Sequence, residues 1–117
     1  MSSTRTRVEA ELTMPDGRQL VEVLRNPAYP QNLGRLRRLG GGVEKGETPQ
    51  QALIRELDEE VGCRVNESQL ELIDTQQRPD CLAVIFRVSD HGLQPGRFDN
   101  AKGGDSTIYL VLDNNMS

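Results

Sequence analysis

Three glutamates in one acidic stretch are the residues best suited to chemistry. Glu56, Glu59 and Glu60 lie in the run RELDEE at 55–60. An α-helix turns about 100° per residue, so positions i, i+3 and i+4 share one face. Leu53 and Leu57 belong to a neighbouring apolar stripe that must face the core. We therefore expect the three carboxylates at the edge of the domain interior.

Carboxylates placed this closely point to a divalent cation. Like charges on adjacent helical turns repel one another, and a cation relieves that repulsion. Carboxylate oxygens are the hard ligands that Mg²⁺ or Mn²⁺ prefers. Acidic helices are also common as ordinary solvated faces, and the helix alone favours that simpler interpretation.

A glycine-rich loop leads into this helix and strengthens the case for a site. Gly40, Gly41 and Gly42 are followed by Gly46. Glycines let the backbone turn tightly and approach a ligand closely. The free N–H groups at a helix N-terminus favour anions. Glycine clusters alone usually mark ordinary turns, but this loop and the acidic helix are joined at a fixed spacing.

The loop and helix together resemble the Nudix hydrolase family. The family pattern is G-x₅-E-x₇-R-E-U-x-E-E-x-G-U, where U is a bulky apolar residue. The chain has Gly41, then Glu47, then RELDEEVGC over residues 55–63, so each specified position matches. Cys63 stands where an aliphatic residue is more usual. The pattern covers about a fifth of the chain, and a chance match of nine specified positions is very improbable.

The resemblance assigns roles to the matching residues. It implies a Mg²⁺ or Mn²⁺ site whose ligands are the Gly41 carbonyl and the carboxylates of Glu56, Glu59 and Glu60. It also implies that Glu47 and Arg55 form a salt bridge that locks the loop onto the helix. Alternatively, Arg55 is a solvated partner of Asp58 or Glu59.

This residue set suits hydrolysis of a phosphoanhydride bond in a nucleoside diphosphate derivative. The negative charge of a pyrophosphate repels a nucleophile, and bound Mg²⁺ offsets that charge and acidifies a coordinated water. A nearby carboxylate can then accept the proton of that water. Glu56 is the best candidate for this base, although it could equally serve only as a ligand. Asp80, Asp99 and Asp105 are reserve candidates.

Arginines just before the glycine loop are candidates for substrate binding. Arg35, Arg37 and Arg38 could hold phosphates, because the guanidinium group matches phosphate geometry. They could equally form a solvated basic strand edge. Tyr29 could stack on a base or anchor its loop. The short chain resembles the small family members that act on nucleoside triphosphates.

Other residues outside the pattern carry weaker signals. Pro79 resembles a marker of family members that cleave ADP-ribose, but a proline before a strand is also an ordinary turn residue. Phe98 could stack or anchor as Tyr29 could. Phe86 is expected in the core, and His91 is expected to be a surface residue and not a catalyst.

The catalytic pattern requires one well-defined helix. Thr48 is a good N-cap, Pro49 suits the first turn, and Gln51 completes a capping box. Residues 50–61 are rich in helix formers, and Gly62 fits the C′ position. The sequence therefore predicts a capped helix carrying the acidic run.

The remaining chain predicts strands around that helix. They are expected at 8–14, 20–24, 35–39, 70–74, 81–88 and 108–112. Pro15-Asp16-Gly17 predicts a turn that makes the first two strands a hairpin. Residues 1–117 are thus expected to form a single α/β domain, which the resemblance makes an α/β/α sandwich with a mixed sheet. The chain offers no convincing family-type helix after Leu112, so a partly open sheet face predicts a homodimer.

Composition narrows the partners and the compartment. The formal charge of −4 gives no general attraction to nucleic acid or to an anionic membrane. No apolar stretch reaches membrane-spanning length. Cys63 and Cys81 show no zinc-binding spacing and are expected to be reduced thiols. We therefore expect a soluble, cytoplasmic protein.

Three functions compete for this sequence. The first is a Mg²⁺-dependent hydrolase, for which a nucleoside triphosphate is the expected substrate and ADP-ribose or a nucleoside diphosphate sugar the alternative. The second is a catalytically silent Nudix-like module that binds a nucleotide. The third is an acidic interaction protein without a ligand. Intact Glu56, Glu59 and Glu60 favour the first, because a silent module has no need of mutually repelling carboxylates.

Overall fold

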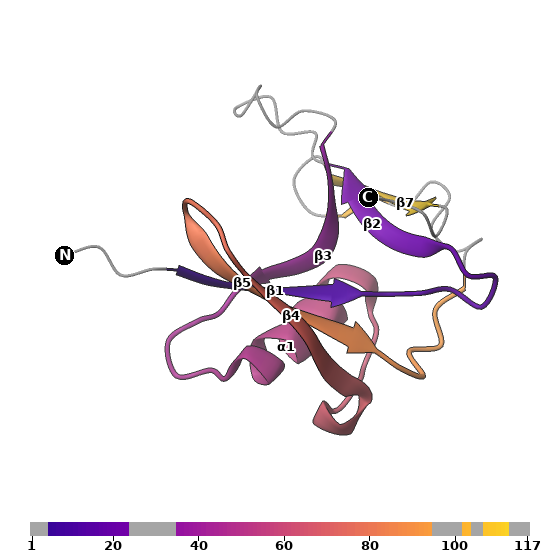
Figure 1. The fold of residues 1–117 in the computed structure, drawn as a ribbon. Helices are drawn as coiled ribbons and strands as arrows, with labels where there is room; N and C mark the ends of the chain where they lie inside the picture. The colour runs from indigo at the N-terminus through magenta and orange to yellow at the C-terminus, as the bar shows by residue number, and fades with distance from the viewer. Residues whose placement is uncertain (1–4, 24–34, 95–101, 104–106, 113–117) are drawn as a thin grey trace.

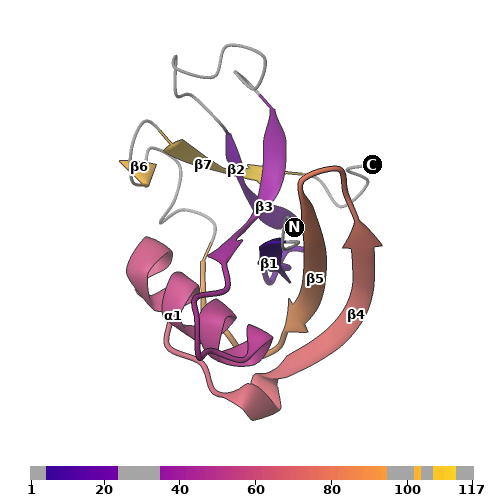
Figure 2. The same ribbon diagram turned by 90° about the vertical axis from the view of Figure 1, so that its left-hand side faces the viewer.

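The structure, a computed structural model, describes residues 5–23, 35–94, 102–103 and 107–112, the last two ranges as backbone alone. Its elements are β1 (Arg5–Glu11), β2 (Gln19–Val23), β3 (Leu36–Gly42), α1 (Pro49–Val61), η2 (Glu67–Gln69), β4 (Leu70–Gln77), β5 (Cys81–Val88), β6 (Lys102–Gly103) and β7 (Thr107–Leu112). Within these residues α1 is the one α-helix, and it lies against a twisted sheet (Figures 1 and 2). Each predicted strand overlaps an observed one.

The predicted caps begin and end α1. The Thr48 side chain accepts a hydrogen bond from the Gln51 amide at 3.1 Å, and the Gln51 side chain accepts one from the Thr48 amide at 3.0 Å. This capping box satisfies two amides that would otherwise lack partners. Gly62 ends the helix with a φ of 64°, and its amide donates to the Asp58 carbonyl at 3.0 Å. The acidic run thus sits on a helix with fixed ends.

Seven strands form one mixed sheet in the order β4-β5-β1-β3-β2-β7-β6. β1 runs parallel to β5, and the other neighbouring pairs are antiparallel. The predicted α/β class and mixed sheet are therefore confirmed. The predicted hairpin between the first two strands is wrong, because β1 and β2 are not neighbours in the sheet. A single isolated bridge, between Thr13 and Gln19, is the pairing observed between the two segments. The reason is that β3 inserts between β1 and β2 and takes both as partners.

β3 links the two halves of this sheet and continues into the predicted glycine loop. Its second half pairs with β1, with Gly40 opposite Glu9, and its first half pairs with β2, with Arg38 opposite Val21. A Cβ atom at Gly40 would lie 1.9 Å from the Val8 carbonyl oxygen. Since no side chain fits there, glycine is what permits β1 and β3 to approach each other. Gly40, Gly41 and Gly42 are therefore all strand residues that also position the site.

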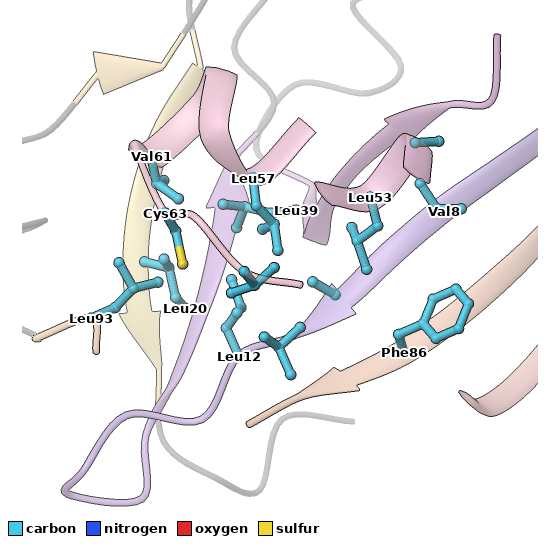
Figure 3. Packing of buried hydrophobic residues seen from close by; sticks show 14 of the residues in the cluster. Val8, Leu12, Leu20, Leu39, Leu53, Leu57, Val61, Cys63, Phe86 and Leu93 are labelled. Atoms are coloured by element: carbon cyan, nitrogen blue, oxygen red, sulfur yellow. The ribbon is translucent and has the colours of Figure 1, made fainter. Parts of the chain in front are cut away.

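A single apolar core joins α1 to the sheet. Figure 3 shows Leu53 and Leu57 pointing from the helix towards Leu39 and other sheet residues. The largest fully buried members are aliphatic, as the low aromatic content requires, and Phe86 is buried as predicted, at 3% exposure. Burial of each leucine contributes roughly 1.5–3 kcal/mol. This contact fixes the rotation of α1 and so sets where its glutamates lie.

Several expectations lie outside the described residues. They concern residues 113–117, where the family helix would follow, and Tyr29, Phe98, Asp99 and Asp105. The homodimer stays a prediction for a hydrodynamic measurement. In the part of the chain that the structure describes, no helix combines the length and the apolar character needed to cross a membrane.

Candidate active site

A salt bridge holds the glycine loop against α1. Arg55 donates to both carboxylate oxygens of Glu47, through Nε at 2.8 Å and through a terminal nitrogen at 2.9 Å. Glu47 also accepts from the Glu44 amide at 2.9 Å. The hydrogen bonds from Arg55, followed by that from Glu44, lower the pKa of Glu47 to about 2. Paired hydrogen bonds of this kind fix orientation as well as distance.

The same guanidinium reaches the end of β3 and the acidic face of the helix. Its second terminal nitrogen donates to Glu56 at 3.1 Å and to Glu59 at 3.0 Å. The terminal nitrogen that binds Glu47 also donates to the Gly42 carbonyl at 3.2 Å. Loop, strand and helix therefore meet at one cation. A contact to Asp58, one of the alternatives for Arg55, is absent from these bonds; Asp58 pairs instead with Arg64 at 3.7 Å.

Glu56 lies directly against the backbone of Gly41. A Cβ atom on Gly41 would fall 2.1 Å from one carboxylate oxygen of Glu56. Only a residue without a side chain can therefore bring its backbone so close to this carboxylate. The Glu56 side chain is 17% exposed, so it retains some access to solvent. The pattern's first glycine and first glutamate thus form one compact unit.

Glu60 lies beside Glu56 and is the most electrostatically perturbed of the acidic residues. Burial, then the hydrogen bond with Glu56, raises the pKa of Glu60 to about 9. The charges of Glu22 and Glu56 raise it further, whereas Arg7 lowers it. In the metal-free protein, Glu60 therefore holds a proton at neutral pH because a second buried negative charge is unfavourable.

Glu59 is placed differently from the other two glutamates. Its carboxylate pairs with Arg55 at 3.0 Å and its side chain is 56% exposed. Within the described ranges, no group of three or more acidic, histidine or cysteine side chains is gathered closely enough to hold a metal ion. The structure thus brings Glu56 and Glu60 together with Gly41, while Glu59 lies at the outer edge.

This donor set is chemically suited to a hard divalent cation. Two carboxyl groups share one proton beside a glycine that leaves them open space. A cation that replaces the shared proton would relieve the repulsion between them, and oxygen ligands are those that Mg²⁺ and Mn²⁺ take. Glu56 and Glu60, with the Gly41 backbone, therefore fit the predicted metal, whereas Glu59 is paired with Arg55.

A second group of charged residues adjoins this pair and was missed by sequence reasoning. Glu9 is buried at 1% exposure, and Arg78 donates to its two oxygens at 2.8 and 3.1 Å. Arg7 donates to Glu9 at 3.0 Å and lies 3.5 Å from Glu22. Buried carboxylates such as Glu9 are expensive unless paired in this way. The one available signal was Glu22, an acidic residue in the otherwise largely apolar strand QLVEV.

The two predicted substrate arginines belong to this group. Arg37 donates through Nε to the buried Glu22, and Arg38 lies 3.7 Å from Glu9. Burial raises the pKa of Glu9, but the hydrogen bonds from Arg78 and Arg7 outweigh burial and hold that pKa below its ordinary value. Glu9 is therefore ionised at neutral pH. Neither arginine is simply a solvated strand-edge residue.

The remaining predicted residues are placed as follows. Asp80 is exposed in the turn between β4 and β5 and lines a cavity of about 220 Å³ with several arginines. Pro79 is exposed in the same turn. One ring nitrogen of His91 lies 2.7 Å from the Thr13 carbonyl oxygen, and the other accepts from Leu93 at 3.0 Å. His91 therefore ties loops together away from the glutamates.

Comparison with known proteins agrees with this fold. The chain matches the NUDIX domain over residues 7–105. No curated protein matches it in sequence. A solved structure from a study of MutT from Aliivibrio salmonicida and Vibrio cholerae is similar to this chain, with a TM-score of 0.72 and 20% identity. The match covers 95% of this chain and 81% of that one.

Two further structures resemble the chain at similar distance. A Nudix hydrolase family member from Chromobacterium violaceum has a TM-score of 0.69 and 25% identity, over 97% of this chain and 65% of its own. An ADP compounds hydrolase has a TM-score of 0.68 and 17% identity, over 96% of this chain and 58% of its own. The chain therefore spans less than two thirds of the length of these two proteins.

The fold and the matched domain define a hydrolase domain with a mixed sheet and a packed helix. Because the domain match covers most of the sequence, the chain belongs to the Nudix family. The expected fold class and the enzyme class are thereby confirmed. Members of this family generally depend on a divalent metal and act on small nucleotide-like substrates. The likeness to the individual structures supports the fold alone.

Proposed function

We propose that this chain hydrolyses a phosphoanhydride bond of a nucleoside triphosphate in a Mg²⁺-dependent reaction. The observation that carries the proposal is the pairing of Glu56 with Glu60 beside Gly41, on a loop fastened by Glu47 and Arg55. Two carboxyl groups this close can together bind a cation that also contacts a phosphate. An ordinary solvated helix face gives no reason to bury Glu60.

The chain's own residues supply binding and proton transfer in this proposal. Glu56, Glu59 and Glu60, with the Gly41 carbonyl, would hold the cation. The cation offsets phosphate charge and acidifies water when bound. Arg55 donates a hydrogen bond to Glu56 at 3.1 Å, which orients that carboxyl group, and Glu56 is the proposed acceptor of the proton that the water releases. Water would form the new P–O bond as the bridging P–O bond breaks.

Arg37 and Arg38 are proposed to contact the substrate phosphates. Both lie on β3, the strand that continues into Gly41 and Gly42, so their positions are fixed relative to the paired glutamates. Guanidinium groups bind phosphate through parallel hydrogen bonds. Tyr29 remains a candidate for stacking on the base, outside the described residues.

One alternative substrate class has an observation behind it. Pro79 stands where a resembling proline marks ADP-ribose-cleaving members, and it borders the arginine-lined cavity next to Asp80. ADP-ribose or a nucleoside diphosphate sugar is therefore the second candidate. A silent nucleotide-binding module is the outcome expected if binding occurs without turnover.

A substrate screen tests the proposal. Release of phosphate and pyrophosphate is measured with nucleoside triphosphates, ADP-ribose, nucleoside diphosphate sugars, dinucleoside polyphosphates and capped RNA, with Mg²⁺ or with EDTA. Glu56→Gln and Glu60→Gln should each lower turnover by about a hundredfold or more, as expected for loss of a metal ligand. Asp58→Asn is the matched control, because Asp58 is an exposed carboxylate on the same helix.

The screen also separates the competing functions. Turnover that survives in EDTA, or equally in Glu60→Gln, would contradict the metal assignment. Glu59→Gln is measured beside them, and undiminished activity in that variant would remove Glu59 from the ligand set. Stabilisation by Mg²⁺ with a nucleotide but without turnover would identify a silent module.

A further inference from the structure

A cleft rich in arginine lies next to the paired glutamates. One cavity of about 220 Å³ is lined by Arg7, Arg35, Arg37 and Arg78, and a second of about 310 Å³ shares three of these. A third, of about 210 Å³, extends past Arg7 and Arg37 to Gly42. Gly42 is the residue whose carbonyl Arg55 contacts. The arginine cleft, defined by these cavities, therefore borders the loop that carries the candidate metal site.

The charge balance of the cleft favours an anion. Four guanidinium groups, those of Arg7, Arg37, Arg38 and Arg78, contact two buried carboxylates, Glu9 and Glu22. Because the cations outnumber the anions, the cluster keeps a surplus of positive charge. Asp80 is exposed at the rim, as is Arg35, and these two contribute opposite charges. A partly enclosed cationic cavity attracts phosphate more strongly than an open surface does.

The buried glutamates orient the arginines without exhausting their donors. A guanidinium group carries five N–H donors. Arg37 uses Nε for Glu22, and Arg78 uses its two terminal nitrogens for Glu9 and Gln76. The Nε of Arg38 is buried and has no hydrogen-bond partner among the described residues. Arginines held by a carboxylate in this way are preorganised for a second acceptor.

The described walls of the cleft do not suit a nucleobase. Among the described residues that line the three cavities, Leu36 and Cys81 are the apolar members, and none is aromatic. A base needs a stacking platform or a matched set of donors and acceptors, whereas a phosphate needs cations and N–H groups. A phosphate group is the chemistry that fits.

We infer that the arginine cleft binds a phosphate of the substrate beyond the two that flank the cleaved bond, and thereby selects nucleoside polyphosphates over nucleoside diphosphate sugars, which lack a third phosphate. Glu9 and Glu22 act as positioning residues that hold Arg78 and Arg37 in the cleft. The hydrolytic consequence rests on the proposed function, but phosphate binding by the cleft does not.

Binding of inorganic tripolyphosphate in EDTA tests the site without the metal. Titration calorimetry of the full chain should give a measurable affinity that falls as salt is raised. Arg37→Gln and Arg78→Gln should each weaken binding by about tenfold or more, the usual value of a charge-assisted hydrogen bond. Arg87→Gln is the matched control, since Arg87 pairs with Glu11 at 2.8 Å and does not line the cleft. It should bind as the unaltered protein does.

The variants distinguish a lost phosphate contact from a destabilised fold. Arg37 is 42% exposed, so its substitution should leave the fold intact even if Arg78→Gln is destabilised. Arg78→Lys retains charge but cannot form the paired contact with Glu9, and it should restore only part of the affinity. Equal binding by Arg37→Gln, Arg87→Gln and the unaltered chain, or no binding at all, would overturn the inference.

Kinetics separate this inference from the proposed function. In the presence of Mg²⁺, Arg37→Gln should raise KM for a nucleoside triphosphate by about tenfold and leave KM for a nucleoside diphosphate sugar nearly unchanged. If Glu60→Gln abolishes turnover while Arg37→Gln affects both substrates equally, the hydrolase stands and the cleft assignment fails. If tripolyphosphate binds through Arg37 but no substrate is cleaved, the cleft stands and the hydrolase fails.

Discussion

Replacing Glu60 by glutamine should stabilise the metal-free protein while removing its response to Mg²⁺. Glutamine has nearly the shape of a protonated glutamate, and its amide can still donate to Glu56. In the unaltered chain, burial and Glu56 raise the pKa of Glu60 to about 9, against 4.5 for an ordinary glutamate. The folded state therefore binds a proton that the unfolded state releases between these two pH values.

The sign of the pH effect follows from this raised pKa. The contribution of Glu60 to stability is fully present below pH 4.5 and is lost as pH rises towards about 9. At about 1.4 kcal/mol per pH unit, the loss at pH 8 has an upper limit of about 5 kcal/mol. Because Glu60 keeps some contact with solvent, we expect roughly 2 kcal/mol in practice.

Urea unfolding in EDTA at pH 5 and at pH 8 measures this difference. With an m value of about 1–3 kcal/mol per molar urea, the midpoint of Glu60→Gln should exceed that of the unaltered chain by about 1 M at pH 8. At pH 5 the two midpoints should nearly coincide. Asp58→Asn, which alters an exposed carboxylate of α1, should show no such dependence on pH.

Addition of Mg²⁺ should then reverse the order of stability. The cation stabilises only a chain that can bind it. The urea midpoint of the unaltered protein should therefore rise, whereas the midpoint of Glu60→Gln should remain unchanged. A Glu60→Gln protein that is no more stable at pH 8 than at pH 5, relative to the unaltered chain, would refute the shared-proton arrangement.

Three further perturbations test other parts of the structure. Gly41→Ala places a methyl group 2.1 Å from the present position of a Glu56 oxygen, so Mg²⁺-dependent turnover should fall by about a hundredfold in an activity assay while circular dichroism stays native. Glu47→Gln removes the carboxylate that Arg55 keeps ionised down to about pH 2. Because this salt bridge holds the loop on the helix, kcat should fall by about tenfold at neutral pH. An unchanged kcat would count against this role of the Glu47–Arg55 salt bridge. Leu57→Ala empties a fully buried position, and calorimetric or urea unfolding should show a loss of about 2–5 kcal/mol; a loss below about 1 kcal/mol would contradict the packing of α1.

Elements governed by neighbouring residues could be predicted from the sequence. The helix carrying the glutamates depends on Thr48, Gln51 and Gly62, whose contacts are all within a few residues of one another. The glycine loop, the clamp from Glu47 to Arg55 and the position of Glu56 likewise lie within one short segment. Short apolar runs bounded by turn residues located most of the strands for the same local reason.

Elements governed by distant partners could not be predicted. The first two strands looked like a hairpin because Pro15-Asp16-Gly17 favours a turn, yet β3 takes the place between them. The pairing of Glu9 with Arg78 joins residues 69 positions apart, and no local pattern relates them. The arginine cleft was thus visible only in part, through Arg37 and Arg38.

The parallel pairing of β1 with β5 has a consequence for how the molecule forms. Arg87 and Glu11, on these two strands, contact each other across 76 positions of sequence. Bringing such distant segments together costs chain entropy before any contact repays it, so a topology of this kind folds slowly. During synthesis, β1 must wait until β5 has left the ribosome, and its apolar face is meanwhile open to chaperones and to aggregation.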